Sequence, residues 1–235
     1  MSMIMRAAVR ARMIAFNPCD DVQLPRPAST RAHRVIITRE EFFGRLLPAV
    51  PIEHRALVGT AGMAGLRWGE CVGLHRDEVD LAGPALHVTR TLVEVNGRLE
   101  IKPYPKSRSG RPMPPALTSL VRAHQLRSAP NDSGLVFAVR TGSAWRRSNF
   151  HRQVWRRALI EAELPRAMRF HDLRHCYATW LVSDNLPINE VQRVLGHEQA
   201  STTLDRYTHA TTGHADKVRA VFANSADFLL TLGAS

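Results

Sequence analysis

The sequence of 235 residues contains few lysines, cysteines and tyrosines, and it has no long apolar run. Its longest uncharged stretch, residues 56–66, is far shorter than the ~20 apolar residues that an α-helix needs to cross a bilayer. No apolar segment of signal-peptide length follows the first arginines, which argues against secretion. We therefore expect a cytoplasmic protein without a membrane span.

The three cysteines are Cys19, Cys71 and Cys176, and no two of them form a C-x-x-C pair. An odd number of widely separated cysteines fits neither a disulfide framework nor a zinc ribbon. We expect all three to be buried, unreactive thiols.

Acidic residues are the minority among the charged side chains. Lys and Arg together number 32 and Asp and Glu 21, which gives a formal net charge of +11. A domain this basic attracts polyanions, of which nucleic acid is the most common. Only three of the basic residues are lysines, however, so a bias in the base composition of the gene would also explain the arginine excess. Charge favours nucleic-acid binding but does not show whether the protein cuts what it binds.

The chain is long enough for one or two domains, and its 44% share of apolar residues is enough for a core. Residues 1–35 have a Met- and Arg-rich start, a stop at Asn17-Pro18 and a Pro- and Arg-rich stretch, which predict a short helix and a linker. Thr38 and Glu41 then form a capping box before an apolar run. We expect a compact domain to begin just before this box.

Most of this domain has helical periodicity. The pattern predicts helices over residues 53–63, 68–74, 115–124, 149–164, 171–182 and 187–195. Gly196 is expected to end the last of them.

The period changes from about 3.6 towards 2 in the middle of the chain. Residues 86–95 and 98–102 flank Asn96-Gly97, which predicts a β-hairpin, and residues 111–113 predict a third short strand at a sheet edge. The expected fold class is α+β: a mainly helical domain with one small three-stranded antiparallel sheet.

The densest group of reactive side chains is HDLRH at residues 171–175. On a helix, His171, Arg174 and His175 share one face. Three interpretations compete: a metal site on the two histidines, a solvated surface, and an anion site. The zinc-protease pattern has Glu where this chain has Asp172, and a guanidinium beside a metal would repel it. A guanidinium fork with a neighbouring imidazole suits a phosphate.

Other segments carry side chains of the same kind. Residues 65–70 (GLRWGE) place Arg67 at a turn, with Glu70 one helical turn away to orient it. Residues 195–197 (LGH) place an imidazole just past a helix, and Tyr207 follows ten residues later. The series carries more weight than any single residue.

Together these motifs resemble the tyrosine recombinases, the group that contains phage integrases and chromosome-dimer resolving recombinases. The resemblance covers residues 36–220, with residues 1–35 as a remnant helix and linker and residues 221–235 as a C-terminal tail. The motifs correspond to the family's first arginine box, its hairpin lysine, its His-x-x-Arg box, its Leu-Gly-His box and its nucleophile. The catalytic residues that this implies are Arg67, Lys106, His171, Arg174, His197 and Tyr207.

The resemblance implies that the protein cuts and rejoins double-stranded DNA through a phosphotyrosine, as a tetramer on DNA, with no metal or other cofactor. The two arginines of these boxes would hold the phosphate, Tyr207 would attack it, and Lys106 would protonate the leaving oxygen. The other tyrosines, Tyr104 and Tyr177, lack the spacing of the nucleophile. We expect His175 to pack behind the site.

Five further arginines are expected to follow the DNA backbone rather than to take part in cutting. They are Arg146, Arg147, Arg152, Arg156 and Arg157.

The sequence departs from the family pattern at its start, where a core-binding domain is expected and only its last helix and the linker are recognisable. The tail after Tyr207 is either a protomer-docking segment or a helix packed on its own domain. Three alternatives to a recombinase stay open: a type IB topoisomerase, a truncated and catalytically weak DNA-binding protein, and a metal-dependent hydrolase on His171 and His175.

Overall fold

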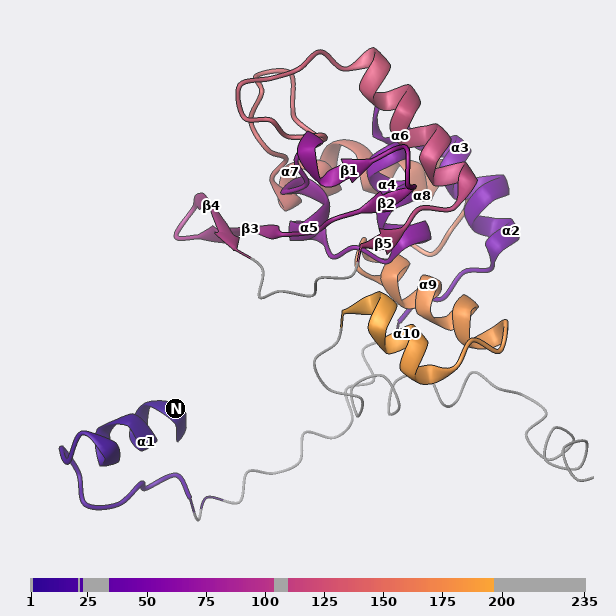
Figure 1. Cartoon of the computed structure of the whole chain (residues 1–235). Coiled ribbons are helices and arrows are strands. Elements are labelled where there is room, and N and C mark those ends of the chain that lie inside the picture. The colour runs from indigo at the N-terminus through magenta and orange to yellow at the C-terminus, as the bar shows by residue number, and fades with distance from the viewer. Residues whose placement is uncertain (1, 21, 23–33, 104–109, 197–235) are drawn as a thin grey trace, which may run out of the picture. The chain divides into compact units, whose positions relative to one another are not determined.

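The computed structural model describes residues 2–20, 22, 34–103 and 110–196 (Figure 1). Contacts between Cα atoms divide the chain into two units, Met1–His33 and Arg34–Ser235. The first unit contains helix α1 (Ser2–Arg10), which ends before the expected stop at Asn17-Pro18. The side-chain amide of Asn17 donates to Asp20 Oδ1 at 2.6 Å within this unit.

The second unit is mainly helical, as expected. Its helices are α2 (Arg39–Glu41), α3 (Leu47–Ala49), α4 (Arg55–Ala64), α5 (Trp68–Val72), α6 (Pro115–Arg127), α7 (Arg147–Phe150), α8 (Arg156–Glu161), α9 (Asp172–Ser183) and α10 (Ile188–Leu195). Two π-helical turns, Phe42–Leu46 and His151–Trp155, join α2 to α3 and α7 to α8. Short 3₁₀ turns cover Ile52–His54 and Arg76–Glu78.

The predicted capping box at the start of this unit is confirmed. Thr38 Oγ1 accepts the backbone N–H of Glu41 at 3.1 Å, and Glu41 Oε2 accepts the backbone N–H of Thr38 at 2.8 Å. The two bonds satisfy N–H groups that a helix start leaves without intrahelical partners.

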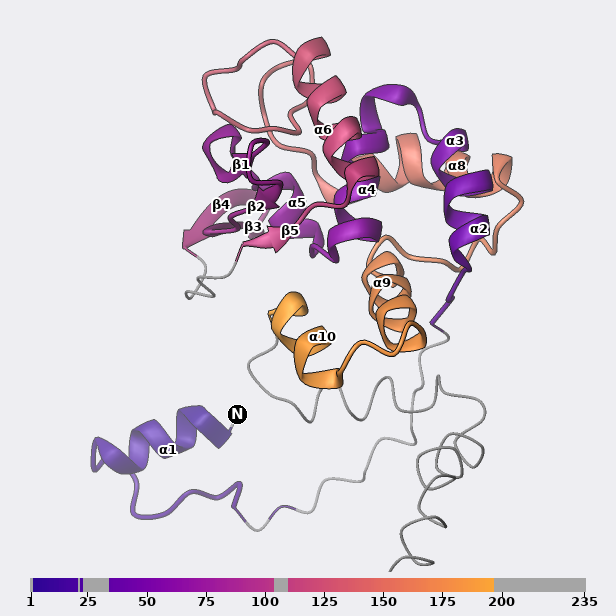
Figure 2. The ribbon, with the colours of Figure 1, turned by 45° about the vertical axis from the view of Figure 1, so that its right-hand side comes forward.

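Helix α4 forms the centre of the core. Residues 56–64 are all buried, and α4 packs against α5, α6 and α9 (Figures 1 and 2). Helix α10 packs in turn on α9, with which it shares a smaller apolar cluster. This arrangement brings the C-terminal end of α4 close to both α9 and α10.

Among the described residues the strands form two sheets, so the prediction that the hairpin and the third strand share one sheet was wrong. Strands β1 (Val79–Asp80), β2 (Ala85–Leu86) and β5 (Arg111–Pro112) make the three-stranded antiparallel sheet. The hairpin strands β3 (Arg90–Val95) and β4 (Arg98–Pro103) pair only with each other among the described residues.

A buried carboxylate explains why residues 86–95 do not form one strand. Glu78 Oε1 accepts the backbone N–H of Thr89 at 2.9 Å and also accepts the Thr89 hydroxyl and Arg90 Nε. The Thr89 N–H therefore cannot donate to a neighbouring strand. Strand β2 ends at Leu86, and β3 begins only at Arg90.

The predicted turn of the hairpin is confirmed. Asn96 and Gly97 have φ values of +50° and +75°, and Val95 pairs with Arg98 across the turn. Two consecutive left-handed residues form a type I′ turn, which Asn-Gly adopts readily. Helix α5 packs closely on β3 at Gly69. A Cβ at this position would lie 2.4 Å from the Leu92 carbonyl oxygen, so only glycine fits there.

Two of the three cysteines are buried as expected. Burial raises the pKa of Cys71 to about 12 and that of Cys176 to about 11. Cys19 is only partly buried. Within the described ranges, no helix is both long and apolar enough to cross a membrane.

Candidate active site

A buried carboxylate, that of Glu70, gathers three guanidinium groups around it. Its side chain is 0% exposed. Arg67 Nη1 lies 2.7 Å from Glu70 Oε1, while Arg111 Nη2 lies 3.5 Å and Arg174 Nη1 3.9 Å from Glu70 Oε2. We call these four residues the Glu70 cluster.

The Glu70 cluster carries more positive than negative charge. Burial alone would raise the pKa of Glu70, but the guanidinium groups of Arg111, Arg174 and Arg67 outweigh burial and lower it. Glu70 is therefore ionised at neutral pH, and one negative charge faces three positive ones. Such an excess of guanidinium groups suits an anion, and their planar forks match the oxygens of a phosphate.

A tight turn after helix α4 places Arg67 at this site. Helix α4 ends at Gly65, whose φ is +65°, and a Cβ at this position would lie 2.6 Å from the Tyr177 ring. Arg67 is the N-cap of α5, and its backbone N–H donates to Glu70 Oε2 at 2.9 Å. Its side chain is 36% exposed, so this guanidinium can meet a ligand from solvent.

Helix α9 supplies the other two predicted residues of the site. His171 is its N-cap, and the buried Asp172 accepts the backbone N–H of Arg169 at 2.8 Å, which fixes the loop before the helix. Arg174 is 3% exposed and donates to the carbonyl oxygens of Gly65 and, at 2.6 Å, Leu195. Arg174 thus ties the end of α4 to the end of α10.

The imidazole of His171 is neutral at pH 7. Burial, followed by the charges of Arg174 and Arg67, lowers the pKa of His171 to about 4. A neutral imidazole can accept a proton from a hydroxyl group. The His171 and His175 rings meet edge to face with centroids 5.0 Å apart, and His175 is buried.

We expect the His171 ring to titrate far below the ordinary histidine value. In an NMR titration of the protein without DNA, its midpoint should be near pH 4, and it should rise in Arg67→Met, because a nearby positive charge is removed. The folded state binds a proton at this ring less readily than the unfolded state does. The contribution of His171 to the free energy of unfolding should therefore be lost as pH falls from 6.5 towards 4. A wild-type midpoint near 6.5 would contradict this account.

The structure brings together Arg67, His171 and Arg174 from the sequence-predicted set. Lys106, His197 and Tyr207 lie outside the described residues. The Leu-Gly-His segment is described only as far as Gly196, which ends α10 with a φ of +64°, as expected.

Arg111 is the member of the Glu70 cluster that sequence reasoning missed. It lies on β5, where the pattern suggested only a short edge strand. Its partners are distant in the sequence, and no local motif marks it. Its burial is visible only in the structure, so no signal in the sequence could have identified it.

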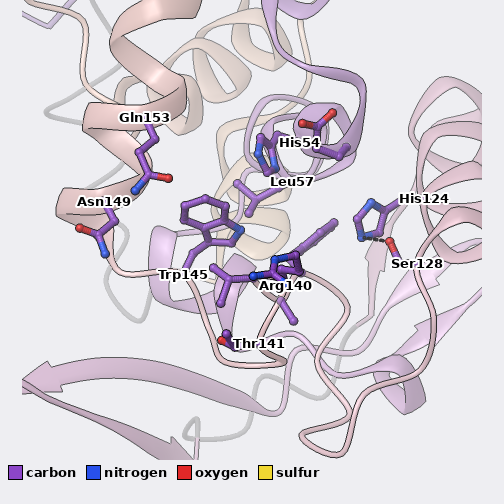
Figure 3. A pocket seen from close by; sticks show the side chains of 13 residues that line it. His54, Leu57, His124, Ser128, Arg140, Thr141, Trp145, Asn149 and Gln153 are labelled. Atoms are coloured by element: carbon purple, nitrogen blue, oxygen red, sulfur yellow. Dashed lines mark hydrogen bonds between the residues drawn. The ribbon is translucent and has the colours of Figure 1, made fainter.

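A cavity of about 550 Å³ lies apart from the Glu70 cluster, none of whose members line it (Figure 3). His54 packs edge to face on Trp145 at its wall, with ring centroids 5.1 Å apart. Burial lowers the pKa values of His54 and His124, and His124 Nε2 bonds the Val136 carbonyl at 2.9 Å. These contacts make the histidines part of the packing around the cavity.

Comparison with known proteins decides the family. The model of the phage integrase family matches residues 44–214, most of the second unit. The chain belongs to the phage integrase family. Among the residues that the structure describes in this family member, no other buried carboxylate has as many arginines around it as Glu70.

Curated relatives of this phage integrase family member are longer than the chain. It is 28% identical to a putative prophage phiRv2 integrase of Mycobacterium tuberculosis over 95% of its own length and 60% of the relative's. It is 31% identical to the tyrosine recombinase XerC of Halalkalibacterium halodurans over 73% of its own length and 54% of the relative's. The chain therefore spans about 60% or less of these two relatives.

A solved structure of the Tn1549 transposon integrase in complex with a circular intermediate DNA has the same fold as this phage integrase family member. The TM-score is 0.74 at 18% sequence identity, and the match covers 95% of this chain and 76% of the other. The similarity supports the mixed helical architecture with small antiparallel sheets.

Proposed function

We propose that this chain is a site-specific DNA recombinase or integrase, which cuts and rejoins DNA through a covalent 3′-phosphotyrosyl intermediate without metal or ATP. One observation carries the proposal: Arg67 and Arg174 flank one buried carboxylate, and both lie near enough to the His171 imidazole for their charges to help lower its pKa. Family membership supports the same chemistry.

The proposed reaction is an in-line displacement at phosphorus. The phenolic oxygen of Tyr207 attacks the scissile phosphate, and the bond to the 5′ oxygen breaks. Arg67 and Arg174 offset the negative charge that builds on the non-bridging oxygens, with His197 as a further hydrogen-bond donor to one of them. His171 accepts the phenolic proton, since its imidazole is uncharged at neutral pH.

The 5′ oxygen leaves with a proton during cleavage and returns in the second half of the reaction, which restores the DNA. Lys106 protonates the departing 5′ oxygen, because an alkoxide is a poor leaving group near pH 7. The phosphotyrosine stores an ester of similar energy to the one that was broken, so a 5′ hydroxyl can reverse the step without ATP. This accounts for a strand transferase without a nucleotide cofactor.

Double-stranded DNA is the proposed substrate, and a homotetramer on DNA the proposed assembly. Arg147, Arg152, Arg156 and Arg157 are exposed, so they can reach phosphates. Arg146 instead pairs with Glu94 and donates to the Gly97 carbonyl at 2.8 Å, which ties it to the hairpin turn. In this proposal residues 36–220 form the catalytic domain, residues 1–35 a helix and linker, and the protein acts in the cytoplasm, where its DNA lies.

Trapping of the intermediate tests this function. The protein is incubated with a duplex that carries a nick next to the scissile phosphate, so that the short 5′-hydroxyl strand diffuses away after cleavage. EDTA is present throughout. We expect a denaturation-resistant protein–DNA adduct whose tryptic nucleotide-peptide contains Tyr207.

The other outcomes separate the alternatives. DNA binding without an adduct would favour a DNA-binding protein that does not transfer strands. Cleavage that EDTA abolishes would favour the metal-dependent hydrolase on His171 and His175. Relaxation of supercoiled plasmid without any site preference would favour the topoisomerase.

Arg174→Lys should slow adduct formation by at least ~10-fold, because an ammonium group cannot reproduce the bidentate geometry of a guanidinium. The structure adds a second reason, since Arg174 also bonds two backbone carbonyls. The rate is measured in single turnover at saturating protein. Arg193→Lys, an exposed arginine on α10, serves as the matched control. Unchanged cleavage in Arg174→Lys would remove Arg174 from the phosphate site.

A further inference from the structure

Arg111 is the buried arginine of the Glu70 cluster to which the proposed reaction gives no role. Its side chain is 5% exposed, compared with 36% for Arg67. Nη1 donates to the Val194 carbonyl oxygen at 2.5 Å, and Nη2 faces Glu70 Oε2 at 3.5 Å. Because both ends of its fork are engaged inside the protein, Arg111 must act through other residues and not by touching DNA.

The end of helix α10 shows what this contact does. A helix leaves its last four carbonyl groups without intrahelical partners. In α10 the N–H of Gly196 bonds the carbonyls of Gln192 and Arg193. The remaining two, of Val194 and Leu195, accept from Arg111 and Arg174. Two buried guanidinium groups therefore complete the cap of this helix, and positive charge is favourable at a helix C-terminus.

The cap joins three segments of the proposed site. Glu70 belongs to the segment of Arg67, and Arg111 begins β5, five residues after Lys106. Val194 lies three residues before His197. The Arg111 fork thus links two described segments that are close in sequence to Lys106 and His197 with the carboxylate that holds Arg67.

We propose that Arg111 is a positioning residue of the cleavage site, which holds the last turn of α10, the helix that precedes His197 in the sequence, against Glu70. The inference rests on the proposed function. An arginine is required because one planar fork must meet a carboxylate and a carbonyl at the same time, which a lysine ammonium on a flexible stem does poorly.

Two variants and one matched control test this role. Arg111→Met removes the fork and keeps an unbranched side chain, Arg111→Lys restores only the charge, and Arg193→Met removes an exposed charge from α10. Single-turnover adduct formation and the Kd for the nicked duplex are measured separately. Misplacement of a catalytic group by about 1 Å costs on the order of 10²-fold in rate.

We expect Arg111→Met to lower the single-turnover rate about 10²-fold and to change Kd less than ~3-fold. Arg111→Lys should recover part of the rate, and Arg193→Met should cleave like the wild type. A wild-type rate in Arg111→Met, or a loss that appears only in Kd, would overturn the proposal.

A measurement without DNA keeps this result distinct from failure of the proposed function. Hydrogen exchange is followed in α10 and, as an internal reference, in α6. In Arg111→Met we expect exchange in the last turn of α10 to rise at least ~10-fold relative to α6, because a capping contact is lost. Equal changes in both helices would overturn the local role of Arg111, whether or not the wild type forms an adduct.

Discussion

Tyr207→Phe is expected to form no covalent adduct with the nicked duplex, a loss on the order of 10⁴-fold or more in cleavage rate. The substitution removes the protein atom that the proposed reaction joins to phosphorus. Loss of a nucleophile of this kind is not compensated by the rest of a site, since the other groups have nothing to activate. Binding of the duplex should persist, because the phenolic oxygen contributes little to an interface dominated by phosphate contacts.

The chain offers a matched control for this substitution. Tyr177→Phe makes the same chemical change at a tyrosine on α9 whose ring is buried against Gly65. Burial raises the pKa of Tyr177, which makes its hydroxyl a poor nucleophile. We expect Tyr177→Phe to form the adduct as the wild type does. An adduct that persists in Tyr207→Phe would move the nucleophile to another residue.

Glu70→Gln is expected to lower the free energy of unfolding by about 3–5 kcal/mol, the usual effect of breaking a buried ion pair. Glutamine has almost the shape of glutamate, so little packing is lost. The charge is lost, however, and the guanidinium groups of Arg111 and Arg174 then face each other in a buried site. Urea unfolding followed by circular dichroism measures the change.

The pH dependence of this loss has a definite sign. The pKa of Glu70 is lowered in the folded protein, so the stability that its charge provides is present above about 4.5 and declines as pH falls through the folded value. The difference in the free energy of unfolding between the wild type and Glu70→Gln should therefore become smaller at acidic pH. Glu190→Gln, which breaks an exposed pair with Arg193, should cost less than ~1 kcal/mol. An equally small effect at Glu70 would contradict the role of the cluster.

The features that sequence analysis predicted correctly depend on residues close together in the chain. Three such features are the box of Thr38 and Glu41, the turn at Asn96-Gly97 and the glycine that ends α10, each of which spans five residues or fewer. Local sterics and hydrogen bonding suffice to specify such features.

The features that it missed depend on partners far apart in the chain. Glu78 draws the Thr89 N–H away from a strand, which divides the expected sheet in two. Arg111 bonds the carbonyl of Val194, 83 residues away. A periodicity of apolar residues carries no information about which buried polar group will meet which carbonyl.

Helical spacing predicts that His171 and Arg174 share one face, but only the family resemblance predicts that Arg67 joins them. Their spacing in the sequence does not show that one carboxylate holds two of them, or that burial keeps the imidazole neutral. Those properties come from the packing of α9 and α10 on the end of α4.

The Glu70 cluster also has a consequence for the newly synthesised chain. Its arginines come from the start of α5, from β5 and from α9, and two of them cap α10, the last described helix. Arg111 and Arg174 gain these carbonyl partners only after α10 has emerged from the ribosome and docked. If the proposed function holds, a nascent chain would therefore lack an ordered phosphate site until its last described helix is in place.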